Sequence, residues 1–266
     1  MRIARFLSSG KVHHGQMIDD QSARRIEGDL FGQHRVTDEV LRIEKLLAPL
    51  VPTDILCIGL NYRQHAAESG SPIPKKPMLF IKASNTLCDP GEPVPIPRLS
   101  SQIDYEAELA VVIGKTAKHV SRQRALDYVL GYTCANDVSA RDWQREKDLG
   151  GGQFARGKSF DKFCPLGPWI VTRDEIADPN ALRIKCTLNG QVMQDLTTGD
   201  MIFSVPELIE SLSSTMTLRP GAVILTGTPQ GVGFARTPPV WLKAGDSVTV
   251  ELEKIGKLTN PITAER

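Results

Sequence analysis

The sequence has few cysteines, no excess of charge of either sign and no long apolar run. Its 32 basic residues nearly balance its 31 acidic ones, and the two kinds are interspersed along the 266 residues. This balance gives no basis for a nucleic-acid or membrane-surface partner. No apolar stretch approaches the roughly 18 residues that a membrane-spanning helix needs. The composition is therefore that of an ordinary globular protein.

The cysteines are five in number, odd and far apart: Cys57, Cys88, Cys134, Cys164 and Cys186. They predict reduced, packed thiols in a reducing compartment, and no CxxC pair offers a zinc site. With no apolar core of a signal peptide at the start, we predict a cytoplasmic protein. The patterns GxSxG, HExxH and GxGxxG are also missing, which argues against serine hydrolases, zincins and dinucleotide-binding enzymes.

Two units are predicted, a small variable N-terminal domain over residues 1–52 and a larger catalytic domain over 53–266. The first has a short strand over Arg2–Leu7 and a helical pattern over Asp38–Leu47. In the second, strand patterns dominate, and the capping box of Ser204 and Glu207 opens an amphipathic helix. Strands are expected over residues 55–60, 104–113, 129–135, 222–226 and 247–253, with a hairpin over 182–194 that turns at Asn189-Gly190. The fold class is thus α+β and mainly β.

Carboxylates are concentrated in the expected strand over residues 104–113. The period of two places Asp104, Glu106 and Glu108 on one face, where a bound cation would relieve their repulsion. Asp137 ends the next apolar run and could add a fourth oxygen ligand. Oxygen-only ligation favours Mg²⁺, Mn²⁺ or Ca²⁺ over zinc. The alternative is a solvated strand face, with Asp137 as a turn or cap residue.

Three other segments carry candidate chemistry. His65 and Glu68 are one helical turn apart, so the pair could activate water as a general base or form an ordinary surface salt bridge. Residues 152–159 match the phosphate-loop pattern GxxxxGK[ST], but no buried strand precedes them, so Lys158 is better interpreted as neutralising a substrate carboxylate or enolate. The turn-rich loop over residues 226–233 could bind an anion through its backbone N–H groups and Thr228, or be purely structural. The segment over residues 70–77 is predicted to be a loop that can move.

The order of the motifs is more specific than any one of them. The chain carries, in sequence, GLNYRQH with Glu68, DYEAE, NDVSARDWQ, GKSFD and LTGTPQGV. From about Ile55 to Pro261 this series resembles the fumarylacetoacetate hydrolase superfamily, in particular its short domain-containing members of the second type. The resemblance implies a mixed β-sandwich roll and a homodimer. It further implies an Mg²⁺ or Mn²⁺ ion held by Glu106, Glu108 and Asp137.

The resemblance also implies roles for the remaining residues. His65 and Glu68 would form the water-activating dyad on a closing lid, and three residues would contact substrate: Gln144, Lys158 and Thr228. The additional metal carboxylate of the founding enzyme has no clear equivalent here, and its substrate-binding tyrosine and arginine cannot be mapped. Fumarylacetoacetate itself is therefore not the expected substrate.

The expected activity is metal-dependent hydrolysis of a C–C bond in a small 2,4-dioxo acid of the acylpyruvate or fumarylpyruvate type. Lys158 would then help to stabilise the resulting enolate. The alternatives on the same site are decarboxylation of oxaloacetate and a tautomerase or isomerase reaction on a 2-hydroxyhepta-2,4-diene-1,7-dioate-type diacid. A non-catalytic metal-binding protein is a further alternative, against which the His65–Glu68 dyad argues.

Overall fold

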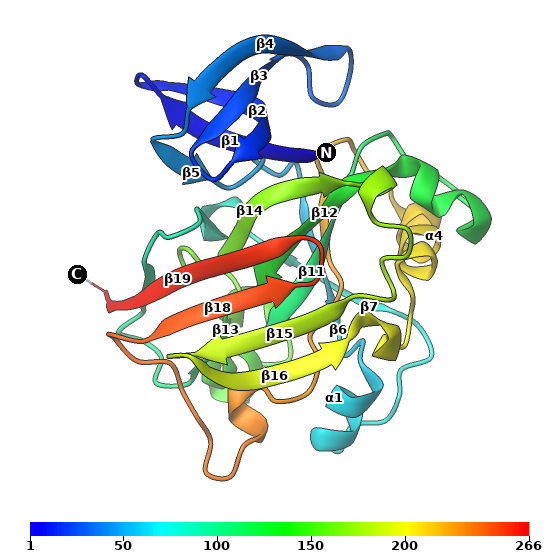
Figure 1. The fold of residues 1–266 in the computed structure, drawn as a ribbon. Coiled ribbons are helices and arrows are strands. Elements are labelled where there is room, and N and C mark those ends of the chain that lie inside the picture. Colours follow the sequence, from blue (N-terminus) through cyan, green and yellow to red (C-terminus); the bar gives the residue numbers. More distant parts are fainter. Residues whose placement is uncertain (266) are drawn as a thin grey trace.

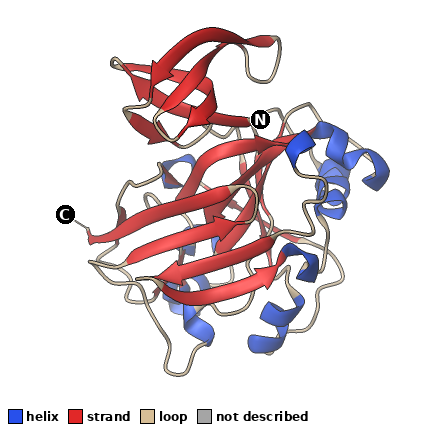
Figure 2. Ribbon diagram, in the orientation of Figure 1, coloured by secondary structure: helices blue, strands red, loops and turns tan. Residues whose placement is uncertain are grey.

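Three β-sheets make up most of the fold, and short helices lie at their margins (Figures 1 and 2). The computed structural model describes residues 1–265. None of the helices in that range has the length and apolar character to cross a bilayer. The predicted β-rich mixed fold is confirmed.

The largest sheet is mixed and runs from the N-terminal unit through the centre of the molecule. Its spatial order is β4 (His34–Arg42), β3 (Ser22–Gly28), β2 (Lys11–Asp19), β1 (Arg2–Ser8), β14 (Cys164–Thr172), β12 (Val129–Asn136), β11 (Ala107–Ile113), β17 (Val223–Leu225), β6 (Ile55–Gly59) and β7 (Met78–Lys82). Two short strands join from the side, β5 (Lys45–Leu47) on β1 and β8 (Leu87–Cys88) on β14. Most neighbouring strands are antiparallel, but β17 pairs with β6 in parallel. The C-terminal ends of these two strands therefore lie at the same edge of the sheet.

A second sheet of five strands covers one face of this centre. Its order is β16 (Gln191–Thr197), β15 (Arg183–Leu188), β18 (Ser247–Leu252), β19 (Gly256–Ala264) and β9 (Val94–Ile96). The predicted hairpin is present, and Asn189 and Gly190 both have positive φ values, 52° and 81°. A third, two-stranded sheet pairs β10 (Ile103–Asp104) with β13 (Ser139–Ala140).

The main core lies between the large and the five-stranded sheet. Every residue of β11 is buried, because β12 and β17 flank it and β15 and β18 cover it. Each fully buried Leu, Val or Ile side chain contributes about 2 kcal/mol of transfer free energy. All five cysteines are buried free thiols, as the sequence analysis predicted.

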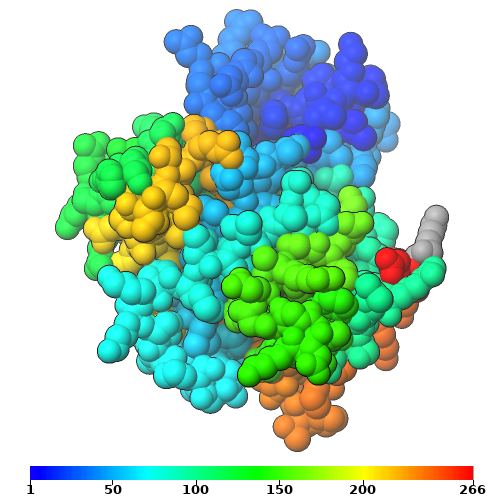
Figure 3. All heavy atoms as spheres, turned by 180° about the vertical axis from the view of Figure 1, so that it is seen from behind, coloured from blue at the N-terminus to red at the C-terminus, as the bar shows by residue number. Residues whose placement is uncertain are grey.

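Strands β1 to β5 form a lobe of their own, coloured blue in Figure 3. Here the helix predicted over Asp38–Leu47 is wrong, because the chain forms β4 and β5 instead. Leu41, Ile43 and Leu46 are partly buried and pack in a small core with Phe6, so their spacing does predict burial. Pairing with β3 satisfies the backbone hydrogen-bonding groups of β4 in strand conformation. Apolar spacing alone does not determine whether such a segment forms a helix or a strand.

The helices are few and short. They are α1 (Arg63–Glu68), α2 (Arg141–Arg145), α3 (Phe154–Gly157) and α4 (Val205–Thr215), with 3₁₀ turns at residues 84–86, 122–128, 147–149, 173–175, 198–200 and 233–235. The predicted capping box is present at α4, where the backbone N–H of Ser204 donates to Glu207 at 2.8 Å. Helices α1, α2 and α3 are at most six residues long. His65 lies on α1 and Gln144 on α2, and Lys158 directly follows α3.

Candidate active site

A cavity of about 200 Å³ collects most of the predicted site residues. Six of them line it: His65, Glu106, Glu108, Gln144, Lys158 and Thr228. The other two are not among the lining residues: Glu68 bonds to His65, and Asp137 bonds to Lys158. The cavity is smaller than the roughly 300–1,000 Å³ typical of sites for drug-sized ligands, so it favours a small substrate.

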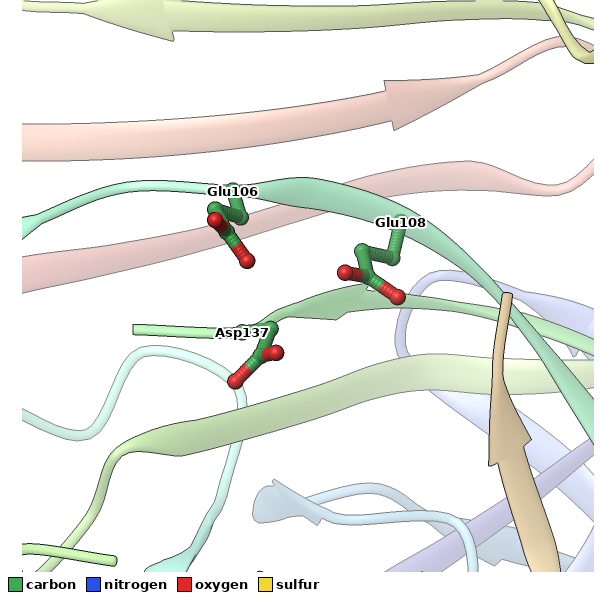
Figure 4. A group of neighbouring side chains, drawn as sticks. All are labelled: Glu106, Glu108 and Asp137. Atoms are coloured by element: carbon green, nitrogen blue, oxygen red, sulfur yellow. The ribbon is translucent and has the colours of Figure 1, made fainter. Parts of the chain in front are cut away.

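Three carboxylates converge at the start of β11. Glu106 immediately precedes that strand and Glu108 is its second residue, while Asp137 follows the end of the paired strand β12. Asp137 donates its backbone N–H to the Glu106 carbonyl oxygen at 2.9 Å, which fixes the two loops together. One carboxylate oxygen from each of the three lies within 4.8 Å of the others, and Figure 4 shows the side chains facing one another.

The expectation that Asp104 shares a continuous strand face with the two glutamates is wrong. The chain leaves strand conformation between β10 and β11, at Tyr105 and Glu106. Asp104 instead accepts hydrogen bonds from the Arg141 guanidinium at 2.8 Å and from the backbone N–H of Gly233 at 2.7 Å. The period-two argument fails because Tyr105 and Glu106 are not in strand conformation, although Arg141 contacts both Asp104 and Glu106.

Three buried cations surround the carboxylates. Lys158 Nζ lies 2.6 Å from Glu106 and 2.7 Å from Asp137, and Lys82 Nζ lies 2.5 Å from the other Asp137 oxygen. Arg141 donates to the second Glu106 oxygen at 2.7 Å. Lys158 and Arg141 hold the pKa of Glu106 well below its usual range, even though burial opposes ionisation. Both Glu106 and Asp137 are therefore carboxylates whose charge the protein itself compensates.

Glu108 is different, because no cationic side chain within residues 1–265 forms an ion pair with it. Among the described residues its only hydrogen-bond partner is the backbone N–H of Gly227, at 2.7 Å to Oε2, and Glu108 is 1% exposed. Burial, and then the charges of Asp137 and Glu106, raise its pKa well above the ordinary value. A buried carboxylate that lacks a positive partner and faces two others fits a hard divalent cation, which would supply the missing charge. The three residues thus suit Mg²⁺ or Mn²⁺, and the donor set alone does not choose between them.

The His65–Glu68 pair is a tight hydrogen-bonded dyad. His65 Nδ1 lies 2.7 Å from Glu68 Oε1, and the second Glu68 oxygen accepts the backbone N–H of Gly231 at 2.8 Å. In the neutral imidazole tautomer with its hydrogen on Nδ1, that hydrogen would be donated to Glu68 and Nε2 would keep its lone pair. His65 is 8% exposed and lines the cavity, so this is not the open surface salt bridge considered from the sequence.

The loop over residues 226–233 organises both halves of the site. Its backbone N–H groups do bind anions, but these are the protein's own Glu108 and Glu68, at Gly227 and Gly231. Gly227 has a φ of 97°, and a Cβ there would lie 2.7 Å from that of Asn61, so no larger residue fits without strain. The segment over residues 152–159 is not a phosphate loop, since it forms only the four-residue helix α3 and its lysine is engaged with carboxylates.

Gln194 on β16, which the sequence analysis missed, links this loop to the carboxylates. Its amide oxygen accepts the backbone N–H of Ala107, between the two glutamates, at 2.9 Å. Its Nε2 donates to Thr228 Oγ1 and to the Pro229 carbonyl, both at 2.8 Å. Because Thr228 accepts from Gln194, its own hydroxyl hydrogen is free to donate toward the cavity.

Comparison with known proteins assigns the family. The sequence pattern described as "Fumarylacetoacetate (FAA) hydrolase C-terminal" matches residues 54–263, which is most of the chain. The chain belongs to the fumarylacetoacetate hydrolase family. A second pattern, "Rv2993c-like, N-terminal", matches residues 1–49.

Curated relatives in this family carry tautomerase names. The chain is 50% identical to "Oxaloacetate tautomerase fahd2, mitochondrial" of Xenopus laevis, over 82% of this chain and 68% of that protein. It is 47% identical to the human protein "Oxaloacetate tautomerase FAHD2A, mitochondrial", over 81% of this chain and 68% of that one. The resemblance to the second type of domain-containing member is thereby confirmed.

Solved structures agree with the fold. A 2-hydroxyhepta-2,4-diene-1,7-dioate isomerase from Mycobacterium marinum superposes with a TM-score of 0.85 at 38% identity, over 100% of this chain and 99% of that one. A fumarylacetoacetate hydrolase from Exiguobacterium antarcticum gives 0.88 at 36% identity over the whole of both chains. The family and its fold are thus established, and the names of the relatives favour the tautomerase or isomerase alternative over hydrolysis.

Proposed function

We propose that this protein is a divalent-metal-dependent tautomerase that interconverts the enol and keto forms of a small 2-oxo diacid of the oxaloacetate type. The observation that carries the proposal is the His65–Glu68 dyad on the wall of a cavity that also contains the carboxylate cluster. The names of the curated relatives point to the same chemistry. A homodimer and a cytoplasmic location remain predictions, and the relatives named above are described as mitochondrial.

Enolisation needs a base at carbon and a stabilised oxygen. His65 Nε2 is suited to take the proton from the carbon between the two carbonyl groups, while Glu68 stabilises the imidazolium that forms. A cation held by Glu106, Glu108 and Asp137 would supply Lewis-acid polarisation of the 2-oxo group. The proton then returns to the enol oxygen, so the reaction is a balanced isomerisation that consumes no water.

Lys158 and Thr228 can help to fix the substrate. Lys158 uses two of its three N–H donors on Glu106 and Asp137, which leaves one for a developing enolate oxygen. Thr228 offers its free hydroxyl hydrogen, since its oxygen already accepts from Gln194. Gln144 is 6% exposed and its oxygen accepts from Arg141 at 3.0 Å, so its amide N–H₂ remains to donate to substrate. The roles of these residues are part of the proposal.

Hydrolysis of an acylpyruvate on the same residues is the second candidate, because the dyad could equally deprotonate a water molecule. The two reactions would use the same carboxylate cluster and differ in the group that faces His65. In a tautomerase the base must face a C–H group of the substrate. In a hydrolase a water molecule must lie between the base and the distal carbonyl.

A coupled assay tests the proposal. Oxaloacetate added as the enol is followed through malate dehydrogenase, which consumes the keto form, with Mg²⁺ at a fixed concentration. We expect the protein to accelerate NADH oxidation well beyond Mg²⁺ alone and His65→Ala to lose about 100-fold or more of that acceleration. Equal rates for the two proteins would refute the proposal. Acylpyruvate loss and pyruvate release, measured in parallel, report hydrolysis and decarboxylation.

A further inference from the structure

Among residues 1–265, Arg145 is the cationic side chain of the cavity that has no carboxylate partner. Of the cationic or titratable basic groups that line the cavity, His65 bonds to Glu68, while Arg141 and Lys158 each bond to two carboxylates. Arg145 also lines the cavity, yet no carboxylate in residues 1–265 forms an ion pair with it. It lies at the exposed rim, directly after the buried Gln144 at the end of α2.

Phe234 holds the Arg145 side chain at this rim. The guanidinium carbon of Arg145 lies 3.8 Å from the centroid of the Phe234 ring. Phe234 is fixed in turn, because Asp104 accepts its backbone N–H at 3.1 Å and that of Gly233 at 2.7 Å. A guanidinium whose face rests on an aromatic ring keeps its in-plane N–H donors available for a carboxylate. The protein therefore positions a cation at the cavity, and no group in residues 1–265 accepts a hydrogen bond from its guanidinium.

The charge balance of the buried ionic cluster indicates which substrate group Arg145 could bind. The cluster has four carboxylates and three cations: Asp104, Glu106, Glu108 and Asp137, against Lys82, Arg141 and Lys158. With all four carboxylates ionised the net charge is one negative, and a divalent cation held there would change it to one positive. A bound 2-oxo carboxylate would bring it to zero, so the second carboxylate of a diacid would need one further positive charge. Arg145 supplies it.

We propose that Arg145 binds the distal carboxylate of the substrate and so selects dicarboxylic over monocarboxylic 2-oxo acids. The inference rests on the proposed function for the 2-oxo end of the substrate, and adds the residue that recognises the other end. Burial and the charge of Arg141 lower the pKa of Arg145, so an anion at its free edge is favourable. The planar fork of a guanidinium also matches a carboxylate with two parallel hydrogen bonds.

Paired substrates test this assignment by kinetics. Oxaloacetate has the distal carboxylate, and its 4-ethyl ester has the same 2-oxo end without that charge. For Arg145→Gln we expect KM for oxaloacetate to rise about tenfold or more and kcat to change little, because the lost contact is to a group that does not react. KM for the ester should change by less than about threefold, and Arg145→Lys should recover part of the oxaloacetate affinity. Arg156→Gln is the matched control, since Arg156 is an exposed arginine stacked on Trp143 outside the cavity lining.

Binding without turnover separates this inference from the proposed function. Calorimetry with Mg²⁺ present compares malate, an unreactive diacid, with lactate, which lacks the second carboxylate. Loss of malate affinity in Arg145→Gln, with lactate affinity unchanged, supports the inference even if the wild-type protein does not tautomerise oxaloacetate. Equal effects on malate and lactate, no effect on either, or the same malate loss in Arg156→Gln would overturn it.

Discussion

Replacing Glu108 by Gln should stabilise the metal-free protein at pH values where Glu108 is ionised, and it should abolish most of the stabilisation by Mg²⁺. Glu108 is the carboxylate of the cluster without a positive partner in residues 1–265, and two like charges face it. Glutamine has nearly the same shape and can still accept the N–H of Gly227. The substitution therefore removes a charge and a candidate metal ligand while the packing is kept.

The size of the effect follows from the geometry. Two unit charges 4.8 Å apart repel by about 3 kcal/mol at an effective dielectric constant of about 20. Lys158, beside Glu106 and Asp137, offsets much of this, so we expect a net gain of about 1 kcal/mol without metal. For a chain of this length that gain corresponds to a rise in Tm of about 2–4 °C. Mg²⁺ at about 100 times its Kd would stabilise the wild-type protein by about 2.7 kcal/mol.

Thermal unfolding with and without Mg²⁺ measures both effects, with EDTA-treated protein as the starting point. The order of the two Tm values should reverse: the variant is more stable without metal, and the wild-type protein is more stable with it. Glu251→Gln on β18 is the control, because this residue pairs only loosely with Lys257, at 3.6 Å, and lies far along the chain from the cluster. An equal rise in Tm with Mg²⁺ in the wild-type protein and the Glu108 variant would refute the ligand assignment.

Two further predictions concern the same site. Gln194→Glu should turn the Thr228 hydroxyl toward the new carboxylate, away from the substrate, and so raise KM for oxaloacetate. Thr228→Val should raise KM to a similar extent, and in a double-mutant cycle the two increases should not add. Because the native pKa of Glu108 is raised above its unfolded value, the destabilisation caused by its ionised form is absent at low pH and grows as the pH rises through the native pKa. The Tm of the metal-free wild-type protein should thus approach that of Glu108→Gln as the pH is lowered through the native pKa of Glu108, and a constant difference would contradict this.

Much of the site could be predicted because the residues concerned lie close to recognisable local structure. Glu106, Glu108 and Asp137 flank two apolar runs that pair with each other, so their convergence follows from the strand pattern once the pairing is known. His65 and Glu68 are one helical turn apart and meet wherever the segment is helical. These contacts are local or depend on a single strand pairing.

The residues that sequence reasoning missed are positioned by contacts between distant segments. Lys82 ends an apolar strand and meets Asp137, 55 residues later, through a strand order that the sequence does not display. Arg145 is significant because no carboxylate of residues 1–265 pairs with it, and such a lack is visible only in three dimensions. The interruption of the expected strand after Asp104 is likewise not apparent from the sequence, and it occurs where Arg141, from a distant segment, contacts both Asp104 and Glu106.

The site combines a rigid half with a half that depends on its surroundings. Glu106, Asp137 and Lys158 are buried and cross-linked by short ion pairs. The dyad instead lies on α1, which has only six residues and is too short to be stable alone, so its position rests on contacts such as that of Glu68 with Gly231. We expect small changes around α1 to alter whether His65 faces a C–H group or a water molecule more readily than they move the buried carboxylates. This would allow one scaffold to serve relatives named tautomerase, isomerase and hydrolase.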